Sequence, residues 1–217
     1  ELNGSGTGYI FKGIGEYIGS ELNVANSHKA LPIYTISANA FENADNLTKI
    51  TIPEGFTSIG ENAFLNCSNL ETIVLPRNLV HIGSQAFYNC VHLKNVTIGD
   101  CVKDIYKNAF DNCANLENLT IGNSIASIGY DSFHFCSSLK EVLIPDSVKY
   151  IGAYAFTYCK ELSKVTIGEN VERIGKRAFF HCELLANVII PITVKSIEEN
   201  AFGDCTLQKV EFVNYVG

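Results

Sequence analysis

The hydrophobic positions of this chain follow one pattern that repeats every 23 residues. Within residues 70–92, the stretch LETIVLP places Leu70, Ile73 and Leu75 on the inward face of a short strand. A fixed period of this size indicates stacked copies of one structural unit, so the pattern predicts a solenoid. The clearest marker of the period is a phenylalanine, found at Phe41, Phe64, Phe87, Phe110, Phe133, Phe156, Phe179 and Phe202.

The same register places one strand in each copy of the repeat. Pro76 lacks an N–H donor and is expected to end the strand that precedes it. The last copy comes one residue early, which indicates a deletion after Cys205. Strands are therefore expected at residues 47–52, 70–75, 93–98, 116–121, 139–144, 162–167, 185–190 and 207–212.

A second column of the repeat holds cysteine, three residues after the phenylalanine. Disulfide bonds between neighbouring copies are disfavoured, because parallel side chains in register give poor Cβ geometry for a bridge. A zinc site needs ligands that converge, which a single column does not provide. We therefore expect a buried ladder of free thiols, and a native protein that reacts slowly with thiol reagents. The column comprises Cys67, Cys90, Cys113, Cys136, Cys159, Cys182 and Cys205, whereas Cys101 falls in a column of small polar residues.

Composition limits the classes of partner. The chain has 217 residues, 47% of them hydrophobic, and a net charge of −7. This acidity argues against nucleic acid as a partner, since nucleic-acid binding needs clustered lysine and arginine. No run approaches the ~18 apolar residues of a membrane span. The sequence contains no methionine, so we expect a processed or excised fragment whose secretion signal has been removed.

Catalytic and cofactor-binding motifs are absent from the sequence. It has no GxSxG, Walker loop, HExxH or GxGxxG pattern, and no cofactor or metal is expected. His134 with Cys136, and His181 beside Cys182, have the residue types of a Cys–His pair. Because both cysteines belong to the buried ladder, the preferred interpretation is a structural thiol next to a surface histidine. The sequence therefore predicts a protein that is not an enzyme.

Stretches such as SVKYIGAYAFTYCKELSKVTI follow the form LxxVxIPxxVxxIGxxAFxxC. This form resembles the 23-residue, treponemal-type leucine-rich repeat of BspA-like bacterial surface proteins, over roughly residues 30–212. The resemblance implies an α/β-class solenoid, a right-handed superhelix with a parallel sheet on its concave side. An irregular or 3₁₀-like convex side is expected, because the segment IGxxAFxxC is too short for a long helix.

The N-terminal part of the chain departs from the repeat. Residues 1–29 lack the period, and TGYIFKGIGEYIG predicts a β-hairpin in which Tyr9–Phe11 precedes a glycine-rich turn. A strand near Leu22–Val24 is then expected to cap the first coil. The repeat array would occupy residues 30–217, as about eight repeats with the last one incomplete.

The C-terminal part ends within a repeat, at VNYVG. Phe212, Val213 and Val216 would have no further coil to cover them. Two interpretations remain open: the chain was cut from a longer protein, or this end packs on something, including a second copy of the chain.

Surface columns, where the repeat does not dictate the residue type, are the places to look for function. On the convex side, positions that are polar in the early copies become aromatic in the fifth to seventh. Clustered exposed aromatic side chains are typical of interfaces, but local packing between coils explains them equally well. This candidate convex patch comprises Tyr130, His134, Phe135, Tyr154, Tyr158, Phe180 and His181.

The concave strand face is the rival candidate. Its outward columns mix polar residues with aliphatic ones, which fits either a solvated sheet or a surface that binds protein. The residues that would form this alternative site are Lys49, Val74, Asn95, Asn118, Leu143, Lys164 and Ile189.

The resemblance implies a secreted or cell-surface adhesion module that binds a protein ligand, such as host extracellular matrix or another surface protein. An architectural spacer, or an accessory domain of a larger surface protein or enzyme, is the alternative. The identity of the ligand does not follow from the sequence.

Overall fold

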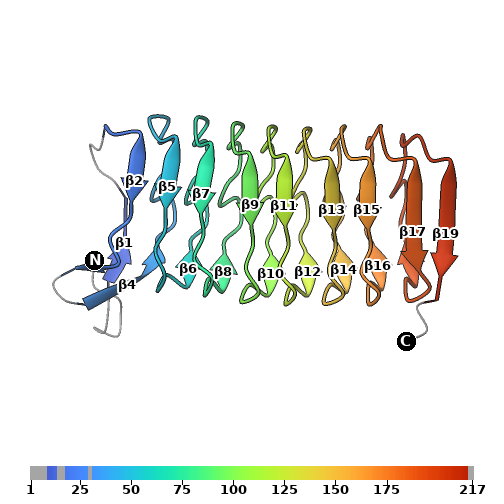
Figure 1. Ribbon diagram of the computed structural model, residues 1–217, viewed down its shortest axis with the longest axis horizontal. Helices are drawn as coiled ribbons and strands as arrows, with labels where there is room; N and C mark the ends of the chain where they lie inside the picture. Colours follow the sequence, from blue (N-terminus) through green and yellow to red (C-terminus); the bar gives the residue numbers. More distant parts are fainter. Residues whose placement is uncertain (1–8, 14–17, 29–30, 215–217) are drawn as a thin grey trace.

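The computed structural model describes residues 9–13, 18–28 and 31–214. These residues form a parallel β-solenoid of about eight turns, in which strands stand side by side in two rows along the long axis (Figure 1). The first and last strands of each row lie at opposite ends of the stack. The leucine-rich solenoid expected from the repeat is therefore confirmed.

The first row contains the strands that the sequence predicts. Most have a buried residue next to exposed ones, as in Glu141–Leu143, where only Val142 is buried. Neighbours pair in parallel at equivalent positions of the repeat, for example Val142 with Val165. The row comprises β2 (Glu21–Asn23), β5 (Lys49–Thr51), β7 (Thr72–Val74), β9 (Asn95–Thr97), β11 (Asn118–Thr120), β13 (Glu141–Leu143), β15 (Lys164–Thr166), β17 (Asn187–Pro191) and β19 (Lys209–Val213).

A second row of shorter strands was not foreseen from the sequence. Most are two residues long and end in a buried isoleucine, and their only regular sequence signal is the pair Ile-Gly. The row comprises β1 (Tyr9–Phe11), β4 (Leu31–Ile36), β6 (Ser58–Ile59), β8 (His81–Ile82), β10 (Asp104–Ile105), β12 (Ser127–Ile128), β14 (Tyr150–Ile151), β16 (Arg173–Ile174) and β18 (Ser196–Ile197). The remaining strand, β3 (Ser27–His28), pairs with β4 in the antiparallel sense.

The convex side corrects the expected fold class. The described residues form neither an α-helix nor a 3₁₀-helix there, so the α/β class is wrong, and of the two alternatives for the back, irregular or 3₁₀-like, the irregular one is found. Instead, alternate N–H groups point along the stack: those of Asn62, Phe64 and Asn66 donate to the carbonyls of Ser84, Ala86 and Tyr88 in the next coil. The N–H groups between them close tight turns within the coil. A helix cannot form, because it would need all of these donors for itself.

The repeated phenylalanines form a continuous stack of rings through the core. Successive ring centroids are 4.7 to 5.4 Å apart and the planes differ by 3° to 9°, from Phe41 to Phe202. Phe11, which lies outside the repeat, extends the stack at 5.2 Å from Phe41. The rings from Phe41 to Phe179 are almost completely buried, so this column is the main filling of the core.

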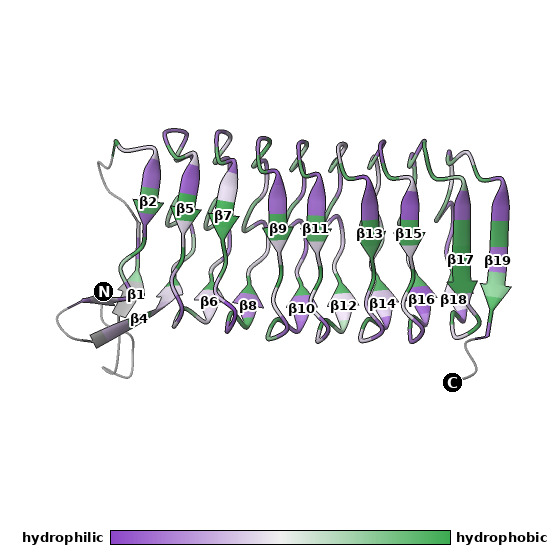
Figure 2. Ribbon diagram, in the orientation of Figure 1, coloured by the Kyte–Doolittle hydropathy of each residue, from purple (hydrophilic) through white to green (hydrophobic). Residues whose placement is uncertain are grey.

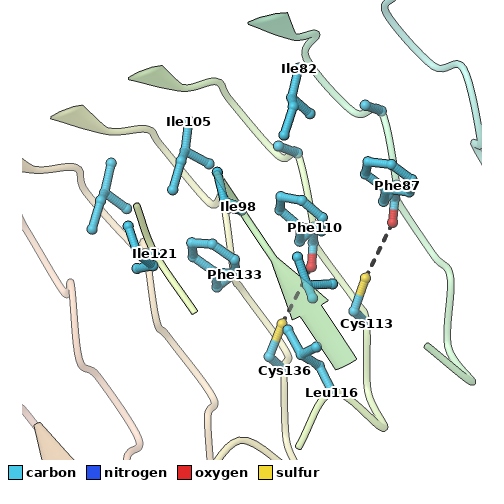
Figure 3. Packing of buried hydrophobic residues seen from close by; sticks show 14 of the residues in the cluster. Ile82, Phe87, Ile98, Ile105, Phe110, Cys113, Leu116, Ile121, Phe133 and Cys136 are labelled. Carbon is cyan, nitrogen blue, oxygen red and sulfur yellow. Dashed lines mark hydrogen bonds between the residues drawn. The ribbon is translucent and has the colours of Figure 1, made fainter. Parts of the chain in front are cut away.

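The cysteine column does more than fill space. Each thiol donates to the backbone carbonyl of the phenylalanine one coil back, at 2.9 to 3.3 Å. Figure 3 shows this for Cys113 with Phe87 and for Cys136 with Phe110. Thiols are weak donors, but these bonds occupy carbonyls that are buried beside the ring stack. All eight cysteines are free, as expected.

Two cysteines depart from the expected burial. Cys101 is exposed, and Cys205 is only partly buried. The expectation that every thiol is protected in the native protein is therefore wrong for Cys101, because its column lies at the surface. Burial raises the pKa of Cys67 to about 12, and it raises the pKa of Cys113 further still.

Both rows of strands are interrupted near the middle of the stack. The first row divides between β11 and β13, and the second divides between β8 and β10. The widest ring spacing of the phenylalanine stack, 5.4 Å, falls at Phe110 and Phe133, in the same region. At the division of the first row, Leu119 is partly exposed, whereas the equivalent Val96 and Val142 are buried.

The ends of the described chain differ from the expected arrangement. β1 pairs in parallel with β4, so its pairing is not that of a hairpin with the residues after it. Residues 14–17 of that hairpin, and the domain boundary at 29–30, lie outside the described residues. β2 overlaps the strand expected near Leu22–Val24 and pairs in parallel with β5.

At the other end, β17 and β19 are longer than the strands before them, and their second halves are hydrophobic (Figure 2). Val210 and Phe212 are 45% and 64% exposed. Val216 lies outside the described residues.

We predict that Phe110→Ala lowers the free energy of unfolding by about 3–5 kcal/mol, because it empties a fully buried site between two stacked rings. Phe202→Ala should cost clearly less, since Phe202 is partly exposed and stacks on one ring only. Chemical denaturation followed by circular dichroism measures both. Equal losses at the two positions would contradict the nearest-neighbour description of the stack.

We also predict that about one thiol per native chain reacts rapidly with Ellman's reagent, because only Cys101 is exposed. The Cys101→Ser variant should lose this fast phase and keep the slow ones. Cys205 should react next, since it is half-buried and a hydrogen bond with Cys182 lowers its pKa. A fast phase that persists in Cys101→Ser would show that the ladder is open to solvent.

Candidate functional site

The convex side of every coil contains two residues in the left-handed backbone region, where φ is between 51° and 61°. Side chains with a Cβ are strained in this region, and asparagine tolerates it best apart from glycine. The first left-handed column comprises Asn39, Asn62, Gln85, Asn108, Asp131, Tyr154, Arg177 and Asn200. The second left-handed column comprises Asn43, Asn66, Asn89, Asn112, Phe135, Tyr158, His181 and Asp204.

In the first four coils, the second left-handed column is a ladder of amides. The side-chain Nδ2 of Asn66 donates to Oδ1 of Asn43 at 2.9 Å, and that of Asn89 donates to Asn66 at 3.0 Å. Asn112 continues the ladder with a bond of 2.7 Å to Asn89. Asparagine at this position therefore suits the backbone and also links neighbouring coils.

In the next three coils, the same column is a ladder of aromatic rings. Phe135 stacks on Tyr158 at 4.7 Å and 7°, and Tyr158 stacks on His181 at 4.7 Å and 13°. We call these three residues the aromatic column. Bulky residues are genuine outliers at positive φ, so each of these positions carries strain that asparagine would avoid.

The other members of the predicted convex patch lie beside this column. Phe180 contacts it edge-on, at 6.3 Å from the ring of Tyr158, and His134 lies 6.0 Å from the same ring in a tilted arrangement. Tyr130 and Tyr154 form a separate pair at 5.5 Å. Tyr130 and Phe135 are 45% and 42% exposed, and the other five are half-buried. The structure thus brings the seven residues onto one surface, where they pack between coils and also present ring edges to solvent.

Charged groups surround the rings. Nδ1 of His134 lies 3.2 Å from Oδ1 of Asp111, and Nε2 of His181 lies 3.2 Å from Oδ2 of Asp204. Lys107 and Arg177 lie over the rings of Tyr130 and Phe180, at 5.6 and 4.9 Å from the centroids. The surface therefore combines aromatic rings with charges of both signs.

The patch adjoins a hollow of about 380 Å³ that is lined by Tyr88, Asp111, Asn112, Asp131, His134 and Phe135. Asp111 is buried and accepts a bond of 2.8 Å from Asn108. Burial raises the pKa of Asp131, and the negative charge of Asp111 adds to this effect. The sequence interpretation missed both aspartates, although each interrupts a column in which the neighbouring copies carry no acid.

The rival site lies on the outward side of the first row of strands, which we call the long-strand face. All seven of its predicted residues are exposed, and Val74, Leu143 and Ile189 are the apolar ones, at 47%, 62% and 44%. Asn118 donates to Asn95 at 2.8 Å. The polar members are thus linked along the stack, and Lys49 and Lys164 are paired with glutamates of the preceding strand.

A hollow of about 280 Å³ marks this face at the division between β11 and β13. It is lined by Leu119, Glu141, Val142, Leu143, Lys164 and Thr166.

Neither Cys–His pair forms a reactive unit. Cys136 and Cys182 are buried and donate to phenylalanine carbonyls, while His134 and His181 pair with aspartates at the surface. In the described part of the chain, no three His, Cys, Asp or Glu side chains are placed to hold a metal ion. Those residues also contain no helix with the length and apolar character needed to cross a membrane.

Comparison with known proteins agrees with this architecture. The chain matches the family described as BspA type leucine rich repeat region, in six copies over residues 34–163 and 103–216. Since the match covers most of the chain, the protein belongs to this family of leucine-rich repeat proteins. None of the curated proteins matches it.

Two solved structures, with TM-scores of 0.62 and 0.60, show the same fold, and a third is a weaker match. The Treponema pallidum leucine-rich repeat protein is 25% identical, with a TM-score of 0.62, covering 98% of this chain and 81% of the other. A leucine-rich repeat protein from Bacteroides ovatus is 21% identical, with a TM-score of 0.60 and coverage of 89% and 69%. A leucine-rich cell surface protein from Faecalibacterium prausnitzii, at 20% identity and a TM-score of 0.41, covers 89% and 87%.

We predict that Phe135→Asn changes the free energy of unfolding by less than about 1 kcal/mol. The loss of stacking, about 0.5–1.5 kcal/mol, is offset by relief of left-handed strain and by a new amide bond to Asn112. The matched control is Phe133→Asn, two residues earlier in the buried stack, which should cost more than about 3 kcal/mol. Thermal and urea denaturation test both, and a large loss in Phe135→Asn would mean that the aromatic column is required for folding.

Proposed function

We propose that this chain is a non-enzymatic binding module, secreted or displayed on a bacterial surface, that binds a protein ligand through its convex aromatic patch. The ligand class that we propose is host extracellular matrix or another surface protein. The observation that carries the proposal is the aromatic column at left-handed positions. There, asparagine would satisfy the backbone and link the coils without strain, as it does in the four coils before.

Strained residues at a surface point to a role other than stability. Left-handed backbone costs about 1–2 kcal/mol for a residue with a bulky side chain, and such outliers cluster at binding sites. Ring stacking contributes about 0.5–1.5 kcal/mol per pair, which is close to the cost of the left-handed backbone. Stacking therefore offsets the strain but adds no net stability. Selection for stability alone would thus favour continuing the amide ladder, whereas selection for binding favours exposed rings.

The composition of the patch supports a protein ligand. Tyrosine and arginine are enriched among the residues that dominate binding energy at protein interfaces, and Tyr130, Tyr154, Tyr158 and Arg177 occur together here. The flanking aspartates and lysines give the patch a polar rim. The patch spans three coils, which is enough for a central cluster within a larger contact.

A binding assay on immobilised fibronectin, laminin and collagen tests the proposal. The convex variant carries Phe135→Asn, Tyr158→Asn and His181→Asn, and the long-strand variant carries Val74→Thr, Leu143→Thr and Ile189→Thr. Each substitution installs a residue that other copies of the same column already have, so both variants should fold. We expect the convex variant to bind at least about tenfold more weakly, a loss of about 1.4 kcal/mol or more.

The long-strand variant should bind as the unaltered chain does. Circular dichroism and the melting temperature serve as controls for folding. If the convex variant keeps full affinity and the long-strand variant loses it, the strand face is the binding site. If the unaltered chain binds none of these proteins, host matrix is not the ligand.

A further inference from the structure

The amide ladder and the aromatic column meet at one place, between Asn112 and Phe135, and the surface is hollowed there. We propose that this hollow receives an arginine side chain of the protein ligand. The inference rests on the proposed function, and it assigns the chemistry of the partner at one end of the convex patch. It depends on three features together: the hollow, the ring of Phe135 beside it, and the carboxylates of Asp111 and Asp131.

The ring of Phe135 offers a stacking surface. One of its faces is covered by Tyr158, from the following coil. Tyr88, Asp111 and Asn112 line the hollow from the preceding coils, so they lie toward the opposite face of the ring. His134, from the same coil as Phe135, packs beside the ring at 4.1 Å between centroids and is tilted by 50°. A guanidinium group stacks on such faces and is more weakly hydrated than an ammonium group, which favours arginine over lysine.

The carboxylates supply acceptors for the guanidinium donors. Asp111 already accepts one bond at each oxygen, from His134 and from Asn108, but each carboxylate oxygen has a second acceptor position. Burial disfavours the charged form of Asp131 and the negative charge of Asp111 adds to this effect, while His134, Asn108 and Lys107 offset part of it. A cation that enters the hollow relieves both effects.

Positive groups near the hollow do not occupy it. Lys107 lies over the ring of Tyr130 and is not one of the lining residues. His134 is the one basic side chain that lines the hollow, and its Nδ1 faces Asp111. The volume of about 380 Å³ would hold about a dozen waters at roughly 30 Å³ each, so a guanidinium and part of its stem fit.

The combination occurs once in the sequence of the array. Positions equivalent to Asp131 hold asparagine, glutamine, tyrosine or arginine, and Glu42 is the only other acid at positions equivalent to Asp111. The ring at Phe135 is also the first aromatic residue of its column. The site is therefore not a by-product of the repeat, which would have generated it in every coil.

The probes are N-acetyl-arginine amide and N-acetyl-citrulline amide, which have nearly the same shape but differ in charge. Each is titrated into the ¹⁵N-labelled chain while backbone amide shifts are followed at Asn112 and Phe135, with Asn43 and Asn66 as internal references. We expect saturable shifts with the arginine probe in the millimolar range, confined to the hollow, and at least fivefold weaker effects with citrulline.

The test variant is Asp131→Asn, which keeps a residue that suits the left-handed backbone and should fold normally. The matched control is Asp204→Asn, which removes the same charge from a left-handed position at the far end of the aromatic column. Arginine binding should weaken at least fivefold in Asp131→Asn and stay unchanged in Asp204→Asn. Equal shifts from both probes, equal losses in both variants, or no saturable shift with arginine would each overturn the inference.

This experiment separates the inference from the proposed function. Loss of matrix binding in the convex variant, combined with no arginine site, would refute the hollow and leave the binding module standing. Saturable arginine binding in a chain whose convex variant keeps full affinity for matrix would refute the proposed function instead.

Discussion

The backbone hydrogen bonds of the convex side constrain the rest of the structure. Alternate N–H groups there donate to the next coil, and this geometry requires two left-handed residues in every coil. The coils are consequently held in strict register, so the phenylalanine rings stack face to face and each thiol meets the carbonyl of the coil before it. A substitution that disrupts the packing of one coil also lowers the stability of the two coils beside it, because each coil buries its faces only against its neighbours.

The same constraint makes the surface informative. Where the backbone demands left-handed φ, asparagine is the residue of least strain, and four successive coils use it to form an amide ladder. Phe135, Tyr158 and His181 satisfy the same backbone at a cost. A departure from the low-strain residue in three successive coils is a stronger indication of function than exposed aromatic residues alone. The described residues of the long-strand face show no comparable departure, since none of them has a positive φ.

Much of the fold follows from the sequence. The 23-residue period, the buried phenylalanine and cysteine columns and the centres of the first-row strands can all be derived from it, because identical stacked units repeat their burial pattern. The convex side could be assigned only as irregular or 3₁₀-like. A short segment such as IGxxAFxxC has no strong periodicity, so its helical or turn character depends on whether its N–H groups bond within the coil or along the stack. The exposure of Cys101 was missed for a related reason, since its column reaches the surface only once the coils are closed.

For the candidate site, the sequence by itself determined which columns change character and in which coils, because a repeat shows departures from its own pattern. It placed all seven residues of the convex patch on one side of the coil. Only the tertiary structure decided that Phe135, Tyr158 and His181 occupy strained left-handed positions, and that Asp111 and Asp131 meet beside Phe135 in a hollow. The physical reason is that strain and proximity are properties of the closed coil. Residues one period apart become neighbours only when the backbone hydrogen bonds between coils fix their spacing.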